Sequence, residues 1–122
     1  MFAATVVAVA VTALLGRKAR RRAHFVAAAV SAGLLVWAIY LAETLGRTLL
    51  MPRGPLLVHL VFANAGAVAF LTVVATGVRL ARTTTGGRRR WHRRAVVAFL
   101  LLVVAAACTG TYMVLQAVPR PQ

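Results

Sequence analysis

Acidic side chains and cysteines are almost absent from this chain of 122 residues, and each absence excludes a class of protein. Glu43 is the only carboxylate. Paired carboxylates for general acid–base chemistry are therefore missing, and so are the several buried acids expected of a proton-driven transporter. Cys108 is the only cysteine, which excludes an intrachain disulfide. The sequence also lacks a nucleophile elbow, a phosphate-binding glycine loop and an HExxH motif, so nothing in it indicates an enzyme.

Apolar and basic residues are abundant instead. Hydrophobic residues make up 61% of the chain, its mean hydropathy is +0.84 and its formal net charge is +14. A soluble fold would have too little polar surface at this composition, so we expect a membrane protein. Of the 15 basic residues, 12 fall into two clusters, Arg17 to Arg22 and Arg79 to Arg94, each between long apolar stretches. Such clusters are typical of cytoplasmic loops, whereas a nucleic-acid binder spreads its basic groups along one solvated face.

The sequence therefore predicts an all-α integral membrane protein, a four-transmembrane-helix bundle in the bacterial inner membrane. The predicted spans are residues 1–16, 24–42, 56–78 and 95–116, with basic cytoplasmic loops at 17–23 and 79–94. The first span is short, about 24 Å against a hydrocarbon core of about 30 Å. We interpret it as a retained anchor because its positive charge follows the apolar region, whereas a signal peptide begins with that charge. Both termini are then outside, and residues 1–122 form a single membrane domain.

The basic clusters also predict a partner. Anionic lipid headgroups are the polyanion that juxtamembrane Lys and Arg residues meet, so we expect membrane lipids and no nucleic acid. The predicted headgroup-binding residues are Arg17, Lys18, Arg20, Arg21, Arg22, Arg88, Arg89, Arg90, Arg93 and Arg94.

Two histidines, His24 and His92, lie at the predicted cytoplasmic ends of the second and fourth spans. Neutral imidazole nitrogens bind metals and haem, so this pair is a candidate site. The neighbouring arginines oppose a bare cation but suit the propionates of haem. The alternative is that both rings are simply hydrated at the level of the headgroups.

A third histidine, His59, belongs to the predicted outer layer together with Glu43. A carboxylate partner can orient a metal-binding histidine or relay protons. The alternative is a hydrogen-bonded pair that only holds two spans together. Cys108 is either a small packing residue or a soft copper ligand. The candidates for a supporting polar role are Glu43, Tyr40, Tyr112 and Cys108.

Several segments together form a recognisable pattern. They are Arg22-Ala23-His24, Tyr40-Leu41-Ala42-Glu43, His59-Leu60, Arg90-Trp91-His92-Arg93-Arg94-Ala95 and Thr109-Gly110-Thr111-Tyr112-Met113-Val114-Leu115. Over residues 22–115 the chain resembles the CtaM-type small multi-span membrane proteins, a family linked to maturation of haem-copper cytochrome oxidases in bacteria. The resemblance implies that His24, His59 and His92, with Tyr112 behind them, handle copper or haem. The short first span and the alanine-rich filling depart from the family pattern.

We therefore expect a non-enzymatic membrane protein of the respiratory membrane that assists assembly of a haem-copper terminal oxidase, presenting a metal or haem through its histidines. One alternative is a structural accessory subunit that packs against other membrane protein subunits and has no chemistry of its own. A second alternative is a small b-type cytochrome, which would need His24 and His92 as axial ligands.

Overall fold

The computed structural model describes residues 21–82 and 86–119, together with Val7, Val11, Thr12, Leu14 and Pro121. Its elements are α2 (Arg21–Thr48), β1 (Leu49–Leu50), α3 (Arg53–Arg82), α4 (Gly86–Leu115) and β2 (Val118–Pro119). The chain forms two compact units. The terminal unit comprises Met1–Leu50 and Val118–Gln122, and the hairpin unit comprises Met51–Ala117.

Helices α2, α3 and α4 are each long and apolar enough to cross a membrane, which is compatible with a multi-pass membrane protein. The predicted four-helix bundle with both termini outside is wrong, because the described residues form three such helices. The predicted first span, residues 1–16, lies outside the described residues except for Val7, Val11, Thr12 and Leu14, which are helical. A stretch of that length rises only about 24 Å as a helix, so its apolar composition alone was a weak basis for a span.

The helices extend beyond the spans expected from hydropathy. Helix α2 continues through Gly46 to Thr48, and α3 already begins at Arg53, so Pro55 lies in its first turn. Proline is tolerated there because the first N–H groups of a helix have no intrahelical acceptor. The N–H of Leu56 donates to the carbonyl of Pro52 over 3.1 Å, which starts the helical hydrogen bonding. The region between the second and third predicted spans is therefore mostly helical.

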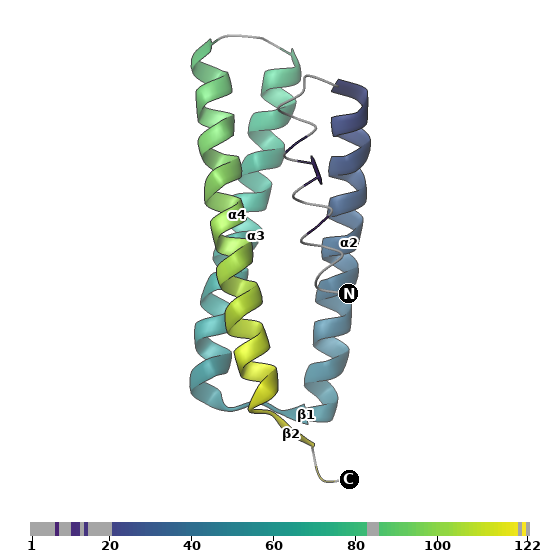
Figure 1. Ribbon diagram of the computed structural model, residues 1–122, viewed down its shortest axis with the longest axis vertical. Helices are drawn as coiled ribbons and strands as arrows, with labels where there is room; N and C mark the ends of the chain where they lie inside the picture. Colours follow the sequence, from purple (N-terminus) through teal and green to yellow (C-terminus); the bar gives the residue numbers. More distant parts are fainter. Residues whose placement is uncertain are drawn as a thin grey trace. The chain divides into compact units, whose positions relative to one another are not determined.

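In the hairpin unit, α3 and α4 lie side by side and run in opposite directions (Figure 1). The rings of Phe70 and Phe99 are 5.6 Å apart, and Phe99 is buried. At Gly66, which is also buried, an added Cβ would lie 3.9 Å from Cβ of Leu102. Small residues between α3 and α4 let the two backbones approach closely, as in membrane helix pairs generally.

Most large apolar side chains on the three helices are exposed, and Phe99 and Met113 are the buried apolar side chains of the described residues. A helix that is apolar around its whole circumference needs an apolar environment, which lipid supplies. The helix surfaces therefore agree with placement in a bilayer.

One strand pair was not expected from the sequence. In the terminal unit, β1 pairs antiparallel with β2, with Leu49 opposite Pro119 and Leu50 opposite Val118. Two residues per strand give no alternation that a sequence pattern could show.

Candidate histidine sites

The ring of His59 is held between α3 and α4. His59 lies in the second turn of α3 and is half-buried. Its Nδ1 lies 3.0 Å from the backbone carbonyl oxygen of Ala106 and 3.4 Å from Oγ1 of Thr109, both on α4. The hydroxyl of Thr109 donates to the carbonyl of Ala105 over 2.8 Å. The imidazole thus joins the two helices of the hairpin unit.

These contacts fix the tautomer of His59. A carbonyl oxygen only accepts hydrogen bonds, so Nδ1 must carry the proton and donate a hydrogen bond to the carbonyl of Ala106. In the neutral ring, Nε2 then has a lone pair. Among the described residues Nε2 has no hydrogen-bond partner. Histidines that bind metals commonly donate their second ring N–H to a backbone carbonyl in this way.

Gly110 leaves the space that the His59 ring occupies. Gly110 is buried on α4, and a Cβ added there would lie 2.9 Å from Cε1 and 3.1 Å from Nδ1 of the ring. Carbon atoms do not approach that closely without displacement. The Thr109-Gly110 dipeptide therefore supplies both a polar contact and room for the imidazole.

His92 has a similar environment at the other end of the hairpin unit. Its Nδ1 lies 3.0 Å from Oγ1 of Thr76 on α3. That hydroxyl donates to the carbonyl of Thr72 over 2.7 Å, so Nδ1 of His92 is the donor in the bond to Thr76. A Cβ added at Gly77 would lie 3.3 Å from Cε1 of His92, which is tight but less so than at Gly110. At each end of the hairpin unit, a histidine ring therefore packs against a Thr-Gly dipeptide of the opposite helix.

The third histidine is in the terminal unit. Nδ1 of His24, near the start of α2, donates to the backbone carbonyl of Thr12 over 2.9 Å. The hydroxyl of Thr12 lies 2.9 Å from that of Ser31, which is buried on α2. Nδ1 of His24 therefore also carries a proton, and its Nε2 has a lone pair when the ring is neutral.

A complete metal site is not assembled in the described part of the chain, since no group of three or more His, Cys, Asp or Glu side chains lies together there. His24 and His92 belong to different units, as do His59 and Glu43. Both pairings predicted from the sequence stay predictions. In the structure, the imidazoles of His24, His59 and His92 are each held singly by a hydrogen bond at Nδ1.

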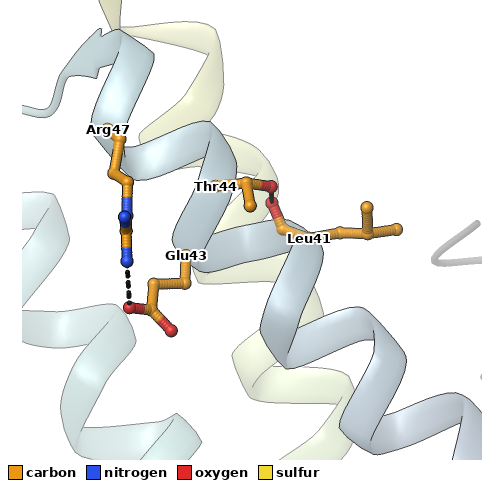
Figure 2. Close-up of polar contacts among 4 residues, drawn as sticks. All are labelled: Leu41, Glu43, Thr44 and Arg47. Atoms are coloured by element: carbon orange, nitrogen blue, oxygen red, sulfur yellow. Dashed lines mark hydrogen bonds and ion pairs between the residues drawn. The ribbon is translucent and has the colours of Figure 1, made fainter.

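Glu43, the only carboxylate, forms an ion pair within α2. Its Oε1 accepts a hydrogen bond from Nη2 of Arg47 over 3.1 Å, and the next side chain, Thr44, donates to the carbonyl of Leu41 over 2.8 Å (Figure 2). Both charged side chains are largely exposed, at 65% for Glu43 and 76% for Arg47. Tyr40 on the same helix is exposed and has its ring 5.7 Å from that of Trp37.

The two remaining polar candidates lie near the end of α4. Cys108 and Tyr112 are both exposed on that helix. Neither has a hydrogen bond to another described residue. Their predicted supporting roles stay predictions.

The candidate lipid-binding arginines are on helix ends. Arg21 begins α2, and Arg17, Lys18 and Arg20 lie outside the described residues. The others are exposed near the starts of α2 and α4, namely Arg22, Arg88, Arg89, Arg90, Arg93 and Arg94. The contact of these residues with anionic headgroups stays a prediction.

The sequence did not predict the hydrogen-bond partners of the three histidines, which are Thr76 for His92 and the backbone carbonyls of Ala106 for His59 and of Thr12 for His24. A signal for the first was present. The position halfway between residues 59 and 109 is residue 84, and the position halfway between residues 76 and 92 is also residue 84. A single uninterrupted antiparallel helix pair would bring both Thr-Gly dipeptides opposite a histidine. The carbonyl of Ala106 left no signal, because every residue has one.

Comparison of the chain with protein families, with curated proteins and with solved structures finds no match.

Proposed function

We propose that this chain is a non-enzymatic, multi-pass protein of the bacterial cytoplasmic membrane that assists maturation of a haem-copper terminal oxidase by presenting His59 as a ligand to haem or copper. The observation that carries the proposal is the hydrogen bond from Nδ1 of His59 to the carbonyl of Ala106. It orients the ring and directs the lone pair of Nε2 away from the backbone.

A single oriented imidazole suits a carrier. His59 would hold haem by binding its iron, for which a single histidine can serve as the protein ligand. One protein ligand also holds a copper ion less tightly than a complete site and leaves positions open for the acceptor. His59 is therefore suited to a transient complex.

The membrane part of the proposal rests on the helices and on the placement of charge. Three helices are apolar enough to span a bilayer. Basic residues gather at the starts of α2 and α4 and at the end of α3, which favours the cytoplasmic side for those ends. The connection to a terminal oxidase rests on the resemblance of residues 22–115 to the CtaM-type proteins.

A ligand titration tests the proposal. Purified protein in detergent is mixed with haem b or with copper ions, and the visible spectrum and the bound metal are measured. His59→Asn is the informative variant, because its amide N–H can replace the Nδ1–H donor while Nε2 is removed. We expect His59→Asn to lose the Soret shift or the bound copper while keeping its helix content.

His92→Asn is the matched control and should retain the ligand. Loss of the Soret band in His92→Asn instead would favour the b-type cytochrome, which needs that residue. A wild-type protein with neither a haem band nor bound copper, under oxidising and reducing conditions, would remove the ligand role.

A second function is a structural accessory subunit of a larger membrane complex. The exposed apolar side chains on all three helices favour it, because such surfaces can pack against other subunits as well as against lipid. Co-purification distinguishes the two functions. A stoichiometric complex that survives high salt indicates a subunit, and a transient one indicates an assembly factor.

A further inference from the structure

The start of α4 has an open groove on its surface. The groove is shallow and open, and its described lining consists of five residues of one helix, Arg93, Arg94, Val97, Ala98 and Leu101. We call these five residues the α4 groove. His92, the residue just before them, bonds to Thr76 on α3, so the hairpin contact uses a different side of α4.

The α4 groove lies where the helix changes from charged to apolar. Five arginines occur between Gly86 and Arg94, and no charged residue follows from Ala95 to Leu115. Along one side of a helix, residues four apart lie one turn apart, so Val97 follows Arg93 and Leu101 follows Val97 toward the apolar part. A molecule in this groove meets two guanidinium groups at one end and only hydrocarbon at the other.

The two arginines have no anionic partner in the described part of the chain. The only carboxylate of the sequence, Glu43, is paired with Arg47. Arg93 and Arg94 make no ion pair with any described residue. Their counter-charge must therefore come from outside these residues, and a guanidinium group matches the oxygens of a phosphate in paired hydrogen bonds.

We propose that the α4 groove binds one anionic phospholipid, with its phosphate at Arg93 and Arg94 and an acyl chain along Val97, Ala98 and Leu101. Charge complementarity and the order of the lining along the helix select this occupant. A second copy of this chain would bring its own net charge of +14 to the same place, which like-charge repulsion opposes.

Native mass spectrometry of the full chain in a non-ionic detergent tests the proposal. Phosphatidylglycerol and phosphatidylcholine with identical acyl chains are the two probes. We expect one tightly retained phosphatidylglycerol per chain and a much weaker signal for phosphatidylcholine. Soluble glycerol phosphate in excess should not displace the lipid, because it lacks the acyl chain that the apolar residues bind.

Two variants test the two ends of the groove. The double variant Arg93→Gln/Arg94→Gln should weaken retention about 30-fold, at about 1 kcal/mol for each basic residue. Its control is Arg22→Gln/Arg82→Gln, which removes the same charge from exposed helix ends outside the groove. Ala98→Phe should block the acyl chain, whereas Ala67→Phe, at an exposed position on α3, should leave retention unchanged.

Equal losses in the two double variants would show a diffuse attraction of headgroups and overturn the proposal. Equal retention of the two lipids, or displacement of phosphatidylglycerol by glycerol phosphate, would overturn it as well. A variant is compared only after its circular dichroism shows unchanged helix content. If a double variant fails to fold, Ala98→Phe and its control Ala67→Phe supply the comparison.

Discussion

His59 and Gly110 are in direct contact across the hairpin unit, so closely that a Cβ at position 110 would lie 2.9 Å from Cε1 of the imidazole. The contact matters because the same ring donates from Nδ1 to the carbonyl of Ala106, one turn earlier on α4. The ring cannot move away from position 110 without disturbing that hydrogen bond. Gly110 is therefore required by the histidine opposite it.

Gly110→Ala should destabilise the hairpin unit. Alanine normally favours a helix over glycine, so a loss of stability would run against intrinsic propensity. We expect a decrease of about 1 kcal/mol in the free energy of unfolding, the size of a hydrogen bond between membrane helices. Titration of detergent-solubilised protein with SDS, followed by tryptophan fluorescence, measures it.

Gly66→Ala is the matched control for this substitution. Gly66 is also buried in the hairpin unit, but an added Cβ there would make an ordinary contact of 3.9 Å with Leu102. This variant should be as stable as the wild type or slightly more stable. If both alanine variants behave alike, the contact of position 110 with the ring has no energetic role.

Thr76 and His92 should be coupled in a double-mutant cycle. Thr76→Val removes the hydroxyl that accepts from Nδ1 of His92 and keeps the shape of the side chain. We expect a coupling energy with His92→Ala of about 0.5 to 1 kcal/mol in the same SDS titration. Thr72→Val combined with His92→Ala is the control, since the exposed hydroxyl of Thr72 donates only to its own helix. A coupling of zero for the Thr76 cycle would contradict the assigned bond.

The helices of the hairpin unit could be predicted from the sequence, and the contacts between them could not. Apolar runs and flanking arginines indicate α3 and α4 because the period and length of a span are properties of one segment. The partner of His59 is a backbone carbonyl, which any residue at position 106 would supply. His59 itself was recognisable as a candidate, because an ionisable group in an apolar stretch needs an explanation.

The ends of the helices were harder to predict for a different reason. A span predicted from hydropathy ends at the first charged or turn-forming residue, which is Glu43 for the second span. The backbone of α2 nevertheless stays helical to Thr48. Intrahelical hydrogen bonds do not depend on whether side chains are apolar, and Glu43 stabilises the extension through Arg47 one turn later. The described residues form three helices long and apolar enough to span a membrane, and the stretch predicted as a fourth span, residues 1–16, lies outside them except for four positions.

The ion pair of Glu43 should contribute little to stability. Both side chains are largely exposed, so solvent or headgroups screen the attraction, and an exposed pair four residues apart on a helix is worth about 0.3 to 0.5 kcal/mol. Glu43→Gln should therefore change the free energy of unfolding by about 0.5 kcal/mol or less. Arg47→Gln is the reciprocal variant and should have the same small effect. A loss several times larger in Glu43→Gln alone would show a further partner of the carboxylate.

Cys108 should be protected from polar reagents in the membrane although it is exposed on the surface of α4. It lies 14 residues after Arg94, about 21 Å along the helix, which places its thiol in the hydrocarbon region if α4 spans the bilayer. A charged maleimide should not label it in open membrane fragments, whereas unfolding in SDS should permit labelling. Gly87→Cys in a Cys108→Ser background is the control and should react without SDS, because position 87 is at the polar end of α4. Rapid labelling of Cys108 in intact fragments would mean that water reaches this part of the helix and that α4 does not cross the bilayer as a lipid-facing span.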